Sequence, residues 1–285
     1  MENAEKKWNL IVDVARCENC NNCYMTILDE YVGNTFAGYS GPCPHHGHHW
    51  IQLHTRERGS GSLMDVAYLF TTCNQCDDAP CRQAARNGAV TKRADGIVII
   101  DPVKAKGQRH LVDACPYGHI WWNEKEDIPQ KWCWDAHLLD AGWKEPRPVS
   151  VCATGSLMAV KISDDQMTDL ADKHGLEVLH PEFGTRPRIW YKNLYRYSGE
   201  HIAGSVAAVK NGIEDVVADA QVTLLKDDRP LDRCKTDFFG DFKFDALKPD
   251  SGEYTIRIQA DGDTRVIGLC LSESVNLGVI RLSER

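Results

Sequence analysis

The chain has 285 residues, of which 42% are hydrophobic and 26% charged, a composition typical of a folded globular protein with room for two domains. Its 33 basic and 41 acidic residues give a formal net charge of -8, which argues against binding to nucleic acid or to an anionic membrane surface. No apolar run approaches the roughly 20 residues of a spanning helix. The segment Met1–Trp8 has neither an apolar signal core nor a twin arginine. We therefore expect no nucleic-acid partner, no membrane and a cytoplasmic location.

Short elements alternate with cysteine loops in the first half of the chain. A strand over 8–14 leads into the first cysteine loop, and a hairpin over 88–101 is predicted to turn at Asp95-Gly96. Asp101-Pro102 supplies an N-cap and a first-turn proline for a helix that we expect to end near Cys115. Another strand is predicted to begin at His119.

The second half of the chain has a different pattern of predicted elements. A helix capped by Ser163 and closed by Gly175 is predicted, and a strand follows over 188–192. From His201 onward, short alternating runs separated by glycine turns predict an all-β sandwich. The expected fold class is α+β, with a bacterial ferredoxin-like iron-sulfur domain over 1–155, a connecting segment over 156–200 and the sandwich over 201–285. The sandwich resembles small transthyretin-like or carboxypeptidase-regulatory-like modules, which implies a fold and not an activity.

Twelve cysteines are the main chemical signal, and ten of them lie within the first 152 residues. Their close grouping indicates metal ligands, because a disulfide scaffold would be smaller and would spread its cysteines more evenly. Cys17-x2-Cys20-x2-Cys23 matches the opening of a bacterial ferredoxin run, where three thiolates bind one iron-sulfur cube and the fourth ligand comes from far along the chain. A zinc ion could use two of these cysteines, but three at this spacing favour a cube.

A second set has four cysteines. Cys73-x2-Cys76-x4-Cys81 together with the later Cys115-Pro116 supplies the thiolates for one complete [4Fe-4S] cluster. Polar neighbours such as Gln75 argue against simple packing of these cysteines as small hydrophobic residues. No nucleophile-base pair, phosphate loop or dinucleotide fingerprint stands out, so we expect no catalytic residue in this chain.

These spacings resemble the electron-transfer subunits of molybdopterin oxidoreductases, and above all the small subunits of pyrogallol-phloroglucinol transhydroxylases. The likeness covers the whole chain, including the terminal β module. Besides the cysteine loops, it includes the segments Gly47–Trp50, Arg56–Gly59, Gly96–Gly107, Trp121–Glu124, Ala136–Asp140 and Tyr191–Tyr195. The resemblance implies a non-catalytic subunit in a heterodimer with a large chain that carries a molybdenum or tungsten bis-pterin cofactor and transfers hydroxyl groups between polyphenols.

Two alternative functions remain open. The first is an electron-transfer subunit of a related phenol hydroxylase, dehydroxylase or other molybdopterin reductase. The second is a purely structural subunit in which the clusters only stabilise the fold.

The family pattern implies three four-iron clusters, and this sequence departs from it. The ligand positions of one cube are occupied by Ile27, Trp132, Asp135 and Ser150. We therefore expect that cluster to be absent. Thr154 stands at the distant fourth ligand position of the first cube, and Cys152 is the obvious substitute; without it the second cluster would be [3Fe-4S] rather than [4Fe-4S]. The expected metal ligands are Cys17, Cys20, Cys23, Cys73, Cys76, Cys81, Cys115 and Cys152.

Further expectations concern the remaining cysteines and the lost cube. Cys43 and four nearby histidines suggest either a metal site or a polar loop, and the surrounding glycines and prolines favour the loop. Ile27, Trp132 and Trp134 should fill the position of the lost cube, since an empty apolar hole is costly, and core or interface packing is favoured over electron relay for the tryptophan pairs. Asp135 is expected to face solvent or to bond with Ser150. Cys234 and Cys270 are expected to fill the sandwich core.

Overall fold

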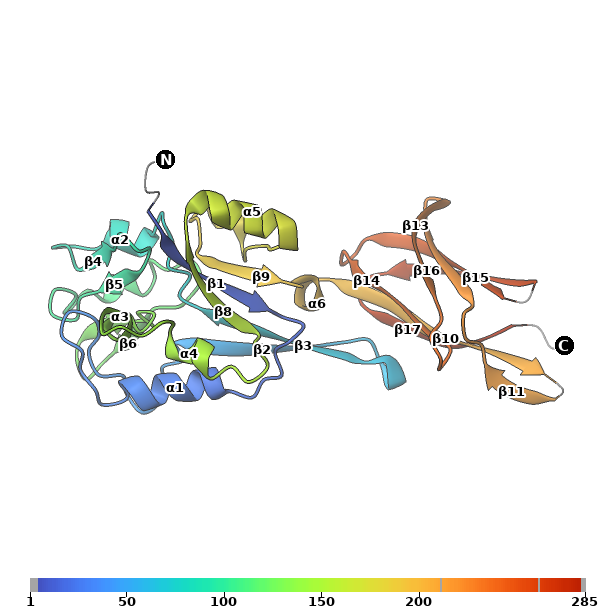
Figure 1. Cartoon of the computed structure of the whole chain (residues 1–285), viewed down its shortest axis with the longest axis horizontal. Helices are drawn as coiled ribbons and strands as arrows, with labels where there is room; N and C mark the ends of the chain where they lie inside the picture. The colour runs from blue at the N-terminus through green and yellow to red at the C-terminus, as the bar shows by residue number, and fades with distance from the viewer. Residues whose placement is uncertain (1–4, 211, 261, 283–285) are drawn as a thin grey trace. The chain divides into compact units, whose positions relative to one another are not determined.

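The computed structural model describes residues 5–210, 212–260 and 262–282 (Figure 1), so the first half of the segment Met1–Trp8 lies outside the described residues. The chain divides into two units, which we describe separately. The first unit contains residues 1–54 and 68–193, and the second contains residues 55–67 and 194–285.

A three-stranded sheet forms one part of the first unit. Its central strand β1 (Lys7–Asp13) pairs antiparallel with β8 (Leu157–Ile162) and parallel with β9 (Ile189–Lys192). Helix α5 (Asp164–His174) packs on this sheet through Met167 and Ala171 (Figure 1). The expected connecting segment 156–200 thus contributes both outer strands and this helix to the sheet.

Helix α5 has the ends that its sequence predicts. The Ser163 side chain accepts a hydrogen bond from the Gln166 backbone, and the Gln166 side chain accepts one from the Ser163 backbone, which is a capping box. Gly175 closes the helix in the left-handed conformation with φ 60°. The predicted helix is confirmed.

The remainder of the first unit is rich in loops and short elements. Its short helices are α1 (Asn22–Tyr31), α2 (Pro80–Ala84), α3 (Ala136–Asp140) and α4 (Arg147–Ser150), and its 3-10 turns include η2 (Arg109–Leu111) and η3 (Pro181–Phe183). Two hairpins pair β4 (Val90–Lys92) with β5 (Val98–Ile100), and β6 (Trp121–Asn123) with β7 (Ile128–Gln130). The predicted hairpin over 88–101 is confirmed.

The predicted helix after Asp101 is wrong beyond its first turn. The Asp101 carboxylate accepts hydrogen bonds from the backbone N–H groups of Val103 and Lys104, as an N-cap should. Gly107 then adopts φ 73°, which breaks the helical path, and only the single turn η2 follows.

The second unit is rich in β structure, as the alternating pattern predicts. Strand β10 (Glu200–Lys210) pairs with β11 (Ile213–Val216), β14 (Asp241–Leu247) and β17 (Val275–Arg281). A second sheet has the order β13 (Arg229–Lys235), β12 (Gln221–Lys226), β15 (Gly252–Ala260) and β16 (Asp263–Leu271). Inward residues of both sheets, among them Val222, Phe244 and Ile256, form one buried apolar cluster.

A hairpin from the first half of the chain contributes to the second unit. Strands β2 (Ile51–Arg58) and β3 (Asp65–Thr72) pair with each other, and the segment between them contains the 3-10 turn η1 (Gly61–Leu63). The tip of this hairpin, residues 55–67, belongs to the second unit together with α6 (Tyr195–Ser198). No local sequence pattern indicates this connection.

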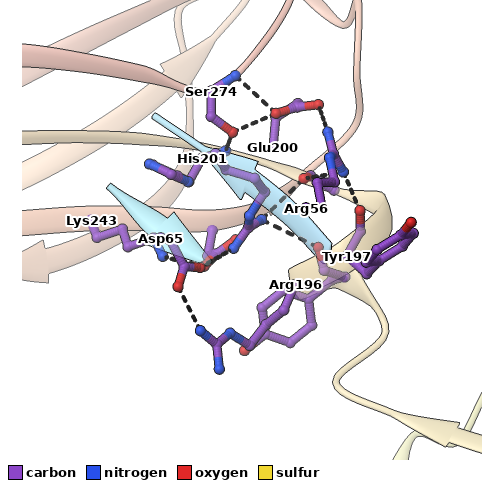
Figure 2. Close-up of polar contacts among 12 residues, drawn as sticks. Arg56, Asp65, Arg196, Tyr197, Glu200, His201, Lys243 and Ser274 are labelled. Atoms are coloured by element: carbon purple, nitrogen blue, oxygen red, sulfur yellow. Dashed lines mark hydrogen bonds and ion pairs between the residues drawn. The ribbon is translucent and has the colours of Figure 1, made fainter. Parts of the chain in front are cut away.

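Ion pairs hold the hairpin tip within the second unit (Figure 2). The fully buried Arg58 guanidinium pairs with Asp65 and, at 3.0 Å, with Asp245. Asp65 also accepts hydrogen bonds from Arg196 at 2.5 Å and from Lys243 at 3.1 Å. Burial alone would raise the pKa of Asp65, but these three cationic donors outweigh it and hold the pKa well below its usual range.

Candidate iron-sulfur centres

Four cysteines of the first unit line one pocket. These are Cys73, Cys76, Cys81 and Cys115. Cys73 directly follows β3, whose buried residues fix the start of the loop. Gln75 has a left-handed φ of 49°, which turns the chain tightly between the first two cysteines. Cys81 lies in the first turn of α2, after a proline at the first helical position.

Three of these four thiols are buried, Cys115 is partly exposed, and their charges act on one another. Burial, together with the charge of Cys73, raises the pKa of Cys76 and of Cys81 to about 12. A thiol must lose its proton to bind a metal, so a cationic group has to compensate the thiolates in this pocket. Four thiolates around one cavity are the donor set of a [4Fe-4S] cluster, and the residues present therefore fit that group.

The first cysteine loop is shaped by two asparagines. Asn19 and Asn21 have left-handed φ angles of 53° and 61°, a conformation that asparagine tolerates better than most residues. They wrap the loop tightly just before α1, in whose first turn Cys23 lies. Two further cysteines of this loop, Cys17 and Cys20, are more exposed than Cys23.

The structure brings Cys152 to this loop. Burial is the main cause of the raised pKa values of Cys17 and Cys23, and the charge of Cys152 adds to both; the value for Cys23 reaches about 12. The Cys152 Sγ atom lies 3.8 Å from the Thr154 Oγ1 atom. Thus the cysteine that the sequence suggested as a substitute lies close enough to Cys17 and Cys23 for its charge to act on both.

Apolar residues at or next to the expected ligand positions of the missing cube are buried. Ile27 is 1% exposed, and Trp132 and Trp134 are completely buried. The two indole rings have centroids 5.7 Å apart. The interpretation of Trp132 and Trp134 as core residues is confirmed, whereas the absence of a third cluster from this region stays a prediction.

Asp135 departs from expectation, since its side chain is fully buried and does not contact Ser150. Its Oδ1 atom accepts hydrogen bonds from Tyr31 Oη at 2.6 Å and from Trp132 Nε1 at 2.8 Å, and its Oδ2 accepts one from the Arg147 backbone N–H at 2.9 Å. Burial raises the pKa of Asp135, and this effect outweighs the hydrogen-bond donors, which lower it. The prediction failed because the Tyr31 donor is 104 residues away in sequence.

Ser150 behaves as expected. Its side chain is exposed and donates a 3.0 Å hydrogen bond to Glu145. Of the two polar residues at former ligand positions, only Ser150 therefore faces solvent.

The Cys43 segment forms a polar loop. Cys43 is buried whereas His45 and His46 are exposed, and His49 stacks on Tyr24 with ring centroids 5.5 Å apart. Across the described residues, no group of three or more His, Cys, Asp or Glu side chains could hold a single metal ion.

The two cysteines of the second unit differ from each other. Cys234 is partly buried against the apolar core, as expected, and no disulfide joins it to Cys270. The expectation for Cys270 is wrong, because this residue is exposed. Its neighbour Leu271 takes the inward position, and successive residues of a strand point to opposite faces.

Lys131 is a residue that sequence reasoning missed. It follows β7, its side chain is 4% exposed, and its ammonium group donates hydrogen bonds to the carbonyl oxygens of Val98 at 2.6 Å and Trp132 at 3.3 Å. A lone lysine after a short apolar strand is usually solvated, so no sequence signal marks it as buried.

Comparison with known proteins defines the class. A family model described as "4Fe-4S dicluster domain" matches residues 64–162, which makes the chain an iron-sulfur protein. The pyrogallol hydroxytransferase small subunit of Pelobacter acidigallici is 42% identical over 284 residues, which cover 97% of this chain and 100% of that protein. The chain belongs to the same family, the iron-sulfur small subunits of molybdopterin oxidoreductases.

More distant relatives are components of reductases. One component of the tetrathionate reductase of Salmonella typhimurium is 28% identical over 66% of this chain and 73% of its own length. The beta component of the perchlorate reductase of Dechloromonas aromatica is 30% identical over 57% of this chain and 50% of its own. No helix in the described part of the chain is long and apolar enough to cross a membrane.

Proposed function

We propose that this chain is the iron-sulfur subunit of a molybdenum or tungsten bis-pterin hydroxytransferase that acts on polyphenols such as pyrogallol. The active site lies on a larger partner chain. The near full-length similarity to a pyrogallol hydroxytransferase small subunit supports this function. The observation that carries it is the burial of Ile27 and Trp132, which cannot bind iron, at two expected ligand positions of the third cluster. A hydroxyl transfer that is redox-neutral overall needs no continuous electron path to an outside carrier, so it tolerates the loss of that cluster.

Two clusters form part of this proposal. A complete [4Fe-4S] cluster is held by the pocket cysteines Cys73, Cys76, Cys81 and Cys115. A second [4Fe-4S] cluster is held by Cys17, Cys20, Cys23 and Cys152; it is [3Fe-4S] if Cys152 does not bind iron. Such clusters supply one-electron storage, and the chain contributes their thiolates; those of the complete cluster line one pocket. The family's third cluster is absent from this chain.

The finer features of the fold and the assembly follow from the same proposal. The first unit is of the bacterial ferredoxin-like type, and the second is a transthyretin-like sandwich. The subunit works in a cytoplasmic heterodimer with the large chain. No disulfide joins any of the twelve cysteines in the described residues, which supports a reducing compartment.

The test is anaerobic co-expression with the large pterin-binding partner chain. We expect about seven or eight irons per small subunit, as one complete cube and a second cube with three or four irons require, and hydroxyl transfer from pyrogallol to phloroglucinol by the purified complex. About twelve irons would contradict the two-cluster assignment. A complex that binds both clusters but transfers no hydroxyl group between polyphenols would contradict the activity.

An alternative is an electron-transfer subunit of a molybdopterin reductase, which the reductase relatives favour. Such a subunit has to deliver electrons from an outside donor. Stoichiometric consumption of a reduced dye during turnover would support this alternative, whereas turnover without an external reductant supports the hydroxytransferase.

A further inference from the structure

Lys131 is buried without a carboxylate partner. Among the described residues no Asp or Glu oxygen lies within 4 Å of its ammonium group, whose hydrogen bonds go to the carbonyl oxygens of Val98 and Trp132. The buried arginines among the described residues are paired with carboxylates. For example, Arg58 pairs with Asp65 and Asp245, and Arg188 pairs with Asp77 and Asp164.

A buried and unneutralised ammonium group is unfavourable, because removing a charge from water costs several kcal/mol unless an opposite charge compensates it. The described part of the chain provides no such opposite charge in contact with Lys131. A negatively charged group bound by the polypeptide would supply the missing countercharge.

Hydrogen bonds connect Lys131 to the pocket and the loop of the second cysteine set. Val98 lines the cysteine pocket, and its carbonyl oxygen accepts the shorter Lys131 hydrogen bond at 2.6 Å. Gln75, which lies between Cys73 and Cys76, accepts a 2.8 Å hydrogen bond from the Val98 backbone N–H. The Gln75 side chain also donates at 3.2 Å to the Trp132 carbonyl oxygen, the second acceptor of Lys131. These bonds fix the ammonium group relative to the cysteine loop.

The positive charge of Lys131 affects the pKa of two proposed cluster ligands. Although burial dominates and raises the pKa of Cys81 and of Cys115, the positive charge of Lys131 acts in the opposite direction on both. It therefore favours negative charge at two of the four sulfur atoms of this pocket.

We propose that the Lys131 ammonium group is the countercharge of the iron-sulfur group bound by Cys73, Cys76, Cys81 and Cys115, and that it sets the reduction potential of that group. This inference rests on the proposed function. A four-iron core with four thiolates is a dianion when oxidised and a trianion after it accepts one electron. A fixed positive charge stabilises the trianion more than the dianion, so Lys131 raises the potential. No bond forms or breaks in this step.

The experiment is an anaerobic redox titration of the co-expressed complex with dithionite as one-electron donor, followed by electron paramagnetic resonance. Lys131→Gln removes the charge but keeps a hydrogen-bond donor, and Lys131→Arg keeps the charge. Lys104→Gln makes the same change in net charge at a side chain that is 55% exposed, and it is the matched control. Iron content is measured for every variant.

In Lys131→Gln we expect one of the two midpoint potentials to fall by at least a tenfold change in the reduction equilibrium, about 59 mV for one electron. Lys131→Arg and Lys104→Gln should keep the wild-type values. Unchanged potentials in a fully loaded Lys131→Gln complex would overturn the inference, as would an equal shift of both potentials. If Lys131→Gln loses the cluster of this pocket, retention by Lys131→Arg supports the charge role, whereas loss in both variants overturns it. A wild-type complex without iron in this pocket would instead refute the proposed function.

Discussion

The hydroxyl group of Tyr31 donates a 2.6 Å hydrogen bond to the carboxylate of Asp135, although 104 residues separate them in sequence. Both side chains are completely buried. Residue 135, an expected ligand position of the missing cluster, therefore makes a polar contact among buried side chains, and the side chains around it can be tested separately.

Trp132→Ala should strongly destabilise the first unit. The substitution empties a completely buried site and removes the indole donor to Asp135, so we expect a loss of about 3 to 5 kcal/mol. Trp132→Phe keeps most of the volume but not the donor, and should cost about 1 to 3 kcal/mol. Denaturant unfolding followed by tryptophan fluorescence measures both, because all eight tryptophans lie in the first unit. Equal stability of the alanine variant and the wild type would show that the indole does not fill the site.

Asp135→Asn should change how stability depends on pH. Burial raises the folded-state pKa of Asp135. Its contribution to the free energy of unfolding is therefore fully present below the ordinary aspartate pKa of about 4 and is lost as pH rises through the raised pKa. Asparagine does not ionise, so the free energy of unfolding of the variant should rise relative to that of the wild type as pH increases. At low pH the variant should be less stable, because its amide would face the Arg147 N–H donor. Thermal unfolding of both proteins over a pH series measures this difference, and parallel curves would exclude ionisation of Asp135 as its cause.

Cys152→Ser should alter the first cluster, whereas Thr154→Ala should not. Because the Cys152 charge acts on Cys17 and Cys23, we expect its loss to leave a three-thiolate site with a labile or missing fourth iron. Iron analysis and the resonance signal of an oxidised [3Fe-4S] cluster are the measurements. A full iron complement in Cys152→Ser, combined with iron loss in Thr154→Ala, would reverse the assignment.

Asp65→Asn should destabilise the second unit by about 3 kcal/mol, since Arg58 would remain buried with Asp245 as its remaining carboxylate partner. Because the pKa of Asp65 is lowered in the folded protein, its contribution to stability is complete above the ordinary aspartate pKa and declines as pH falls through the lowered pKa. The wild type should thus lose more stability than the variant on acidification. Hydrogen exchange of peptides from residues 194–282 tests this, and Asp232→Asn, at an exposed site, is the control.

Local signals predicted much of the fold. The alternating runs of the second unit, the Asp95-Gly96 hairpin and the Ser163 cap all depend on neighbouring residues, so they could be recognised in the sequence. The cysteine spacing likewise indicated which thiols lie on one loop. The failed helix after Asp101 shows the limit, because a good N-cap does not determine where a helix stops.

Long-range electrostatics could not be predicted. Lys131 and Asp135 are ordinary surface residue types, and their burial depends on partners such as Val98 and Tyr31 that are brought near only by the complete fold. The convergence of Cys152 on the first loop was suggested by the count of missing ligands and not by any local pattern.

The hairpin tip at residues 55–67 limits how this protein can be truncated or recombined with its relatives, and how its architecture could have evolved. The chain passes from one unit to the other after residues 54, 67 and 193, so the second unit is not a simple C-terminal appendage. A truncation before residue 194 would leave Arg58 without Asp245, and an isolated C-terminal fragment would leave Asp245 without Arg58. A chimera that exchanges the β module between related proteins must therefore exchange residues 55–67 along with it. For the same reason, end-to-end gene fusion alone does not account for this architecture.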